Sequence, residues 1–298
     1  MNIAVDGSGR MRSILRFTAT LTAVVVCILA IVATIMFWPA SAAGPCVVER
    51  RNTIAELPEA SGLAIGRRTP GIIWSHNDSG NESVLYALDA DGVLRGRVRV
   101  PVRTRDWEDV SAGRCPAGDC LYIGDIGDNR HARGSILIHR VPEPVPGDAE
   151  TAKPETFKGI YADGPHNAEA MFVIGEAVFI VTRDQFGAIY RATLPRAGNL
   201  EMTFERIAEL HMAPVTDAEA SPDETSVVIR TSKVAVVYRA ADLVRGGQLP
   251  QGVTVPIEGL MEPQGEGVAL GGDGTMYLAS EGRPWKRGGR FIRLRCPR

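Results

Sequence analysis

A short motif that returns five times constrains the fold of this 298-residue chain more than any other feature. Each copy has a polar residue, then usually a small one, and then the start of a short apolar run. The polar residues are separated by 47, 61, 48 and 49 residues, and they are Ser61, Glu108, Glu169, Asp217 and Glu266. A repeat of about 40–50 residues is typical of a propeller, in which each repeat forms one blade. The sequence therefore predicts an all-β, five-bladed β-propeller over residues 46–298, with six blades as the alternative.

The two ends of this region are expected to close the ring. The fifth repeat ends with Arg290–Arg295 and lacks an outer strand, whereas the strand-like segment Val47–Leu57 precedes the first repeat. An outer strand runs antiparallel to its neighbour, so the start of one lies beside the end of the other. Cys46 should therefore meet Cys296, and the pairing removes the exposed edges of an open sheet.

The first 45 residues are interpreted as an export segment. Residues 1–16 contain three arginines, and residues 17–38 contain no charge. An apolar stretch of this length can span a bilayer as one helix, and the arginines place residues 1–16 in the cytoplasm. Either 17–38 remains as a membrane anchor followed by the linker 39–45, or the chain is cleaved after Ala42 and secreted. In both cases the propeller lies outside the cytoplasm, at the cell membrane or released from it.

Four of the five cysteines lie in the exported part, and they divide into two pairs. Cys46 and Cys296 mark its two ends. Cys115 and Cys120 bracket a turn between two strand-like runs, so they face each other across a hairpin. Two disulfides fit an oxidising compartment, in agreement with export.

The repeated carboxylates predict a metal site. Glu108, Glu169, Asp217 and Glu266 near one axis repel one another unless protons, cations or a metal ion neutralise them. With Ser61 they form an oxygen-only set, which suits Ca²⁺ because that ion takes about 6–8 oxygen ligands in irregular geometry. The alternative is that each acid receives backbone N–H groups from the neighbouring blade and that no ion binds.

Strand alternation places a second set of loops on the same face as these acids, namely those between the second and third strands of each blade. They supply the candidate catalytic residues His76, Asp78, Asp125, Arg183 and Arg230. His131 and His166 also fall on this face, and either could act as a general acid or base or be a plain loop histidine.

The arginines of this face have two interpretations. Guanidinium groups match phosphate and carboxylate, so Arg130, Arg183, Arg230 and Arg283 form a possible anion clamp or pair with nearby aspartates. Asp125 and Asp128 either bind a second cation or form tight Asx turns. The chain contains no nucleophile elbow, Walker loop, H-E-x-x-H or dinucleotide fingerprint.

The ring of one acid or hydroxyl per blade resembles that of the calcium-activated nucleotidases (apyrases). That resemblance implies one central calcium held by the five residues, and hydrolysis of nucleoside diphosphates and triphosphates on the face above the ion. Ser61-Gly62-Leu63 and Asn77-Asp78-Ser79-Gly80 are also similar to the exported propellers called SdiA-regulated and phytase esterase-like. Those families imply the propeller and calcium but say little about substrate.

Two functions are compatible with these observations. One is a calcium-dependent hydrolase of phosphorylated or other anionic esters. The other is a non-enzymatic propeller, held together by structural calcium, that binds a small anionic ligand or a cell-surface partner. A net charge of −2 gives no support for nucleic-acid binding, and we expect a monomer.

Overall fold

The computed structural model describes residues 46–184, 186–196, 200–212, 214–282 and 288–297, and the statements below concern these residues. The predicted segments 1–16, 17–38 and 39–45 lie outside them. Within the described part of the chain, no helix has the length and apolar character needed to cross a membrane.

The described chain is almost entirely antiparallel β-sheet, arranged as a propeller of several four-stranded sheets. The first sheet contains β2 (Ala60–Ile65), β3 (Ile72–Asn77), β4 (Val84–Asp89) and β5 (Leu94–Arg99). An eight-stranded sheet contains β6 (Trp107–Cys115), β7 (Gly118–Asp125), β8 (Ile136–Pro142) and β9 (Glu155–Tyr161), joined to β10 (Ala168–Ile174), β11 (Ala177–Thr182), β12 (Ala188–Thr193) and β13 (Glu201–Glu209). A third sheet contains β14 (Val215–Ala220), β15 (Ser226–Thr231), β16 (Val234–Arg239) and β17 (Val253–Pro256). The last sheet contains β18 (Gln264–Leu270), β19 (Thr275–Glu281), β20 (Gly289–Arg295) and β1 (Val47–Ile54). Two short helices, α2 (Ala240–Arg245) and η1 (Glu258–Leu260), flank β17.

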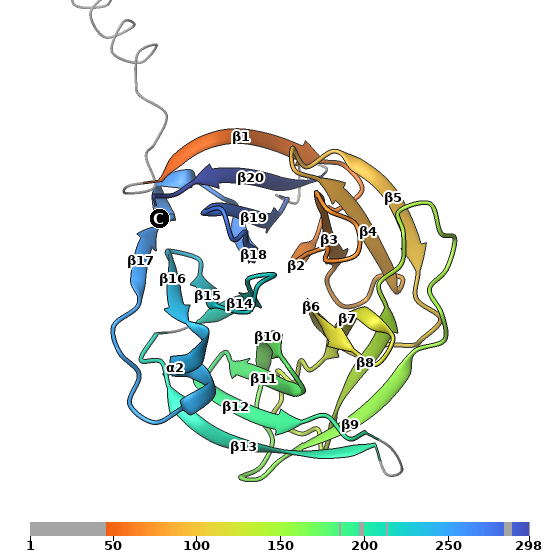
Figure 1. Ribbon diagram of the computed structural model, residues 1–298, viewed down its shortest axis with the longest axis vertical. Coiled ribbons are helices and arrows are strands. Elements are labelled where there is room, and N and C mark those ends of the chain that lie inside the picture. Colours follow the sequence, from red (N-terminus) through yellow and green to blue (C-terminus); the bar gives the residue numbers. More distant parts are fainter. Residues whose placement is uncertain (1–45, 185, 197–199, 213, 283–287, 298) are drawn as a thin grey trace, which may run out of the picture. The chain divides into compact units, whose positions relative to one another are not determined.

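The innermost strands surround one axis. β2, β6, β10, β14 and β18 each contact the next, and β18 contacts β2 again, so the ring is closed (Figure 1). These strands are buried along nearly their whole length, because each is packed between neighbouring sheets. The rim strands β5, β9 and β13 instead alternate between exposed and covered residues, as expected for strands with one face toward solvent.

Apolar side chains fill the spaces between adjacent sheets. Trp74 of β3 and Trp107 of β6 belong to one cluster between the first two sets of strands. Phe172 and Phe179 stack with ring centroids 4.7 Å apart in the cluster that β10 and β11 share with β14. The core is therefore a set of wedges around the axis rather than a single central mass.

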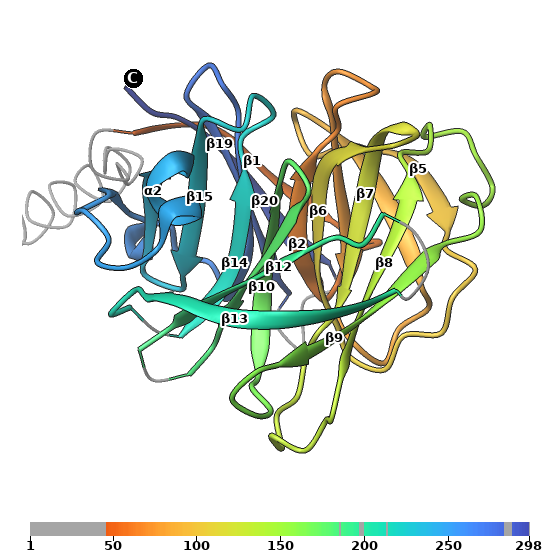
Figure 2. The same cartoon turned by 60° about the horizontal axis from the view of Figure 1, so that its bottom comes forward.

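The eight-stranded sheet arises because two rim strands pair. β13 runs parallel to β9, with Glu201 opposite Lys158 and Phe204 opposite Tyr161 (Figures 1 and 2). On its other side β13 pairs with β12 in the usual antiparallel manner. The sets β6–β9 and β10–β13 are thus joined at the rim as well as near the axis.

The predicted closure is confirmed. β1 pairs antiparallel with β20, with Val47 opposite Arg295 and Ile54 opposite Gly289. A disulfide joins Cys46 to Cys296 across 250 residues of sequence. The last sheet therefore takes one strand from the front of the described chain and three from its end.

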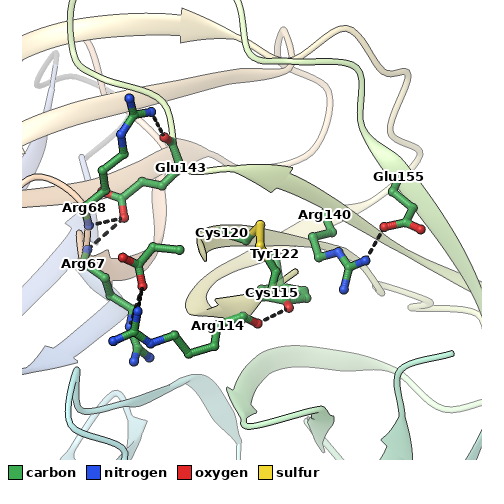
Figure 3. The surroundings of a disulfide bond; sticks show 10 residues. Arg67, Arg68, Arg114, Cys115, Cys120, Tyr122, Arg140, Glu143 and Glu155 are labelled. Carbon is green, nitrogen blue, oxygen red and sulfur yellow. Dashed lines mark hydrogen bonds and ion pairs between the residues drawn. A yellow bond between two sulfur atoms is a disulfide. The ribbon is translucent and has the colours of Figure 1, made fainter. Parts of the chain in front are cut away.

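The second predicted disulfide is also present, at the turn between β6 and β7. Cys115 and Cys120 have Cα atoms 5.9 Å apart. Close by, the buried Glu143 accepts hydrogen bonds from the backbone N–H groups of Arg67 and Arg68, each at 2.8 Å (Figure 3). It also accepts one from Trp74 Nε1 at 3.1 Å, and so ties the β2–β3 turn to the chain after β8. The two disulfides indicate an oxidising, extracytoplasmic environment.

The disulfides should differ strongly in their effect on stability. Chain entropy predicts a loss of about 5 kcal/mol when the 250-residue loop is opened by Cys46→Ser with Cys296→Ser, against about 2 kcal/mol for Cys115→Ser with Cys120→Ser. Denaturant unfolding of the two double variants measures the difference. Equal losses would mean that Cys46–Cys296 does not constrain the unfolded chain.

Candidate functional site

The loops that lead into the innermost strands lie beside the loops between second and third strands, as predicted. The N–H of Asp78 donates to Glu59 O at 2.8 Å, and that of Arg183 donates to Asn167 O at 2.9 Å. We call this side of the propeller the upper face. The Cys115–Cys120 turn lies at the other end of β6, on the opposite face.

A β-bulge interrupts the start of every innermost strand and sets the position of the repeated polar residue. The register shifts fall between Ala60 and Leu63, Trp107 and Asp109, Ala168 and Ala170, Val215 and Asp217, and Gly265 and Val268. An inserted residue of this kind re-aims a side chain, and bulges are frequent beside functional sites. The polar residues within these bulges are Ser61, Glu108, Glu169, Thr216 and Glu266, and we call them the upper ring.

The upper ring differs from the predicted set at one position. Thr216, rather than Asp217, stands in the bulge of β14. Two hydroxyls of the ring make the same contact, since Ser61 Oγ donates to Glu108 O at 2.8 Å and Thr216 Oγ1 donates to Glu266 O at 3.1 Å. The sequence pattern admits either residue, because Thr216 and Asp217 are adjacent and both polar, and the strand pairing separates them.

Asp217 lies below the upper ring, and its counterpart in β6 is Asp109, which the sequence reading did not single out. Asp217 accepts hydrogen bonds from its own neighbour Ala218 and from the backbone N–H groups of Leu63 and Val268. These donors come from three different innermost strands. For Asp217, the alternative in which an acid receives backbone N–H groups from neighbouring sheets is the arrangement observed.

Asp109 completes the connection. It accepts hydrogen bonds from Val110 N and from Met171 N of β10, each at 2.6 Å. Burial, together with the charges of Asp217 and Glu219, raises the pKa of Asp109 well above its ordinary value, so it keeps its proton and donates to Asp217. Gly62 makes room for this carboxyl group, since a Cβ there would overlap it. Asp109 and Asp217 together touch all five innermost strands.

Glu219 is the third buried carboxyl group at the axis. Its Oε1 accepts from Ala112 N at 2.9 Å and its Oε2 from Ser111 Oγ at 2.6 Å, linking β14 to β6 across the ring. Burial raises its pKa well above the ordinary value. We call Asp109, Asp217 and Glu219 the carboxyl hub.

The upper ring is a second, separate layer of charge. Its members are only 5% to 8% exposed, which places them at similar depth. Burial raises the pKa of Glu108 to about 9, and the charges of Asp78, Asp106 and Glu266 act in the same direction. Burial also raises the pKa of Glu266. Arg183 opposes both increases, and its guanidinium forms an ion pair with Glu169.

Several predicted catalytic residues have structural partners instead. Arg230 is fully buried, pairs with Glu262 at 2.9 Å and donates to Gly267 O at 2.8 Å. Asp125 accepts from the N–H groups of Arg105 and Asp106 and pairs with Arg133 at 2.9 Å. These contacts hold loops and strands in place. One predicted alternative is that the arginines of this face pair with nearby aspartates. Arg183 and Arg230 instead pair with glutamates, Glu169 and Glu262.

The predicted histidines contact residues other than the carboxylates of the upper ring. His76 is fully buried and stacks on Trp107 with ring centroids 4.4 Å apart, and burial lowers its pKa to about 4. His166 lies between Asp184, at 3.1 Å, and Asp163, at 3.0 Å. Asp78 remains beside the ring, whereas Asp128 accepts a hydrogen bond from Arg133 N at 2.7 Å.

Arg130 and His131 are exposed, and His131 Nε2 lies 3.9 Å from Asp184. Arg283 lies outside the described residues.

The described side chains do not form a preassembled metal site. Within residues 46–184, 186–196, 200–212, 214–282 and 288–297, no group of three or more His, Cys, Asp or Glu residues is arranged to hold a metal ion. Glu169 is turned toward Arg183, and Asp217 is engaged by the hub. The ligand roles of the five predicted residues therefore stay a prediction.

Comparisons with known proteins identify no family for this chain. No protein-family model matches the chain. No curated protein matches it either.

Solved structures with similar architecture include a glucose dehydrogenase, 12% identical over 83% of this chain and 98% of that one, with a TM-score of 0.48. The WD40 β-propeller domain of Doa1 is 13% identical over 78% of this chain and 64% of that one, with a TM-score of 0.34. Hydrazine synthase from Kuenenia stuttgartiensis is 14% identical over 75% of this chain, which spans 56% of that protein, with a TM-score of 0.41. These similarities carry no information about activity.

The carboxyl hub makes the stability of the folded chain depend on pH. The folded chain retains protons on these buried groups that the unfolded chain releases, so their contribution to stability is complete below the ordinary carboxyl pKa. This contribution to stability is lost as the pH rises through the raised pKa values of the folded chain; the pKa of Asp217 is raised to about 7. With a calcium chelator present, the melting temperature should therefore fall between pH 5 and pH 9.

Glu219→Gln should weaken this fall. Glutamine keeps an oxygen for Ala112 N–H and offers an amide to Ser111 Oγ, but it does not titrate. Each group removed takes away up to about 1.4 kcal/mol per pH unit of the dependence. Glu205→Gln, at an exposed position of β13, is the control. If both variants follow the unmodified chain, Glu219 ionises without cost and the hub account is wrong.

Proposed function

We propose that this chain is an exported, five-bladed β-propeller that binds calcium at the upper ring and acts as a binding protein rather than a hydrolase. Residues 17–38 would anchor it to the membrane, or be removed if the chain is cleaved after Ala42. The observation that carries the proposal is the upper ring itself, with one oxygen-bearing side chain at the same bulge of each innermost strand.

The donor set fits a hard cation in kind. It consists of the carboxyl groups of Glu108, Glu169 and Glu266 and the hydroxyls of Ser61 and Thr216, and calcium prefers such oxygen ligands. Thr216 replaces the predicted Asp217, whose oxygens are already used by backbone N–H groups. The ring also agrees in composition with the central Ser/Glu set of the apyrases that the sequence resembles.

Glu108 is the ring residue that most needs a cation. It is 7% exposed, and no described residue donates a hydrogen bond to its carboxyl group. A buried carboxyl group without donors must stay protonated or be neutralised by a positive charge. Calcium would supply that charge when bound, while the five residues would orient around it.

The surroundings favour binding over ester hydrolysis. Arg230, one of the predicted catalytic residues, is buried against Glu262 and is not accessible to a substrate. His76, one of the predicted catalytic residues, is buried and neutral because burial lowers its pKa to about 4. The ligand would instead be a small anionic molecule or a cell-surface partner that meets the loops of the upper face.

Calcium should raise the melting temperature of the full-length chain, and a chelator should lower it. Saturation at 100 times the dissociation constant adds about 2.7 kcal/mol to the free energy of unfolding. Glu108→Gln should abolish most of this response. Without calcium at pH 7.5 this variant should be more stable than the unmodified chain by about 2–4 kcal/mol, because it no longer has to hold a proton.

Glu82→Gln is the matched control, since Glu82 is an exposed carboxylate between β3 and β4, on the upper face. Its calcium response should equal that of the unmodified chain. If the melting temperature does not change with calcium, or if Glu108→Gln responds as strongly as the unmodified chain, the upper ring does not bind calcium as proposed.

Hydrolysis is tested separately with a panel of nucleoside diphosphates, nucleoside triphosphates and sugar phosphates. We expect no calcium-dependent release of phosphate. Release that requires both calcium and Glu108 would overturn the binding proposal in favour of the hydrolase.

A further inference from the structure

Arg183 is positioned at the upper ring by its backbone as well as by its charge. It follows β11 directly, and its N–H donates to Asn167 O at 2.9 Å, which fixes the start of the loop beside the start of β10. Its guanidinium reaches Glu169 of the ring, and its side chain remains 37% exposed. The backbone is therefore held while the charged end retains access to solvent.

The positive charge of Arg183 acts on more than its direct partner. It opposes the raised pKa values of Glu108, Glu266, Asp78 and Glu281, which come from four separate parts of the chain. Asp106 and Glu59 add further negative charge to the same surroundings. Arg183 therefore acts electrostatically on several carboxyl groups of the upper face, while its direct partner is Glu169.

Arg230 cannot take over this role. It also lowers the pKa of Glu266, but its guanidinium is completely buried and fixed by Glu262, Gly267 O and Thr231 O. Moving it would leave a buried charge unpaired, which is costly. Arg183 can rotate toward solvent because more than a third of its side chain is already exposed.

We propose that Arg183 is the built-in competitor of the calcium site: its guanidinium neutralises the upper ring in the absence of metal, and a divalent cation binds by displacing it from Glu169. This inference rests on the proposed function. The displacement would account for the arrangement of the ring without metal, in which Glu169 is turned toward Arg183 and the ring donors do not surround a common point.

The charge of the ring carboxylates favours a divalent ion in this exchange. A sodium ion brings the same single positive charge as the guanidinium it would displace, and it also has to break the Arg183–Glu169 pair. A divalent ion brings twice the charge to Glu108, Glu169 and Glu266, so it gains Coulomb energy on exchange. Arg183 therefore lowers the affinity for every cation by the same factor, and a divalent ion still binds because the ring carboxylates attract it more strongly.

The test is a calorimetric titration of the full-length chain with calcium chloride at pH 7.5, using Arg183→Gln and Arg183→Lys. Removing the competitor in Arg183→Gln should tighten the calcium dissociation constant at least tenfold. Arg183→Lys keeps the positive charge and should stay close to the unmodified value. Arg130→Gln removes an exposed arginine from the same face and should change nothing.

Melting temperatures provide a second readout. In chelator, Arg183→Gln should melt below the unmodified chain because its ring lacks a cation, and saturating calcium should remove the difference. If this variant does not fold in chelator, its recovery on addition of calcium supports the same conclusion, and a failure to recover contradicts it. High sodium chloride should also stabilise Arg183→Gln more than the unmodified chain.

The outcomes separate the two proposals. If the unmodified chain binds calcium and Arg183→Gln binds it equally or more weakly, Arg183 is not a competitor, although the calcium site survives. If neither binds calcium, the proposed function fails and the exchange fails with it.

Discussion

Two buried aspartates, Asp109 and Asp217, connect the innermost strands at the axis of the propeller. Asp109 donates to Asp217, and between them their oxygens reach backbone N–H groups of all five innermost strands. Hydrogen bonds within a sheet do not hold neighbouring sheets together, so a ring of sheets needs contacts of another kind at its centre. The apolar wedges supply bulk attraction, whereas the carboxyl hub fixes how the strands line up along the axis.

The hub and the upper ring solve the same electrostatic problem differently. In the hub, backbone donors and a retained proton satisfy carboxyl groups that solvent does not reach. In the upper ring, one residue further toward the loops, Glu108 has no such donors, and the nearby guanidinium of Arg183 pairs with Glu169. Adjacent residues in the same strands thus have different surroundings: Asp109 and Asp217 connect the strands, and the bulged residues beside them form the site that we propose for calcium.

Sequence reasoning recovered the parts of the structure that repeat. The interval of about 48 residues located every innermost strand, and strand direction alone predicted that β1 would pair with β20 and that Cys46 would meet Cys296. It could not assign Asp217 to the correct layer, because a bulge shifts the side-chain register by one residue and the shift is visible only in the pairing. Placing Trp107-Glu108-Asp109 over Val215-Thr216-Asp217 would have been the available signal. The partners of Arg183 and Arg230 depend on contacts between distant loops, which no local pattern encodes.

The disulfide between Cys46 and Cys296 has a mechanical consequence. A pull on the chain ahead of Cys46 would otherwise load the hydrogen bonds of β1 and peel that strand from β20. The covalent link sends the force directly into the end of β20, which is an interior strand of its sheet with β19 on its other side. A propeller fixed at that end could therefore bear tension in flow or in a crowded envelope without its ring being opened at the seam.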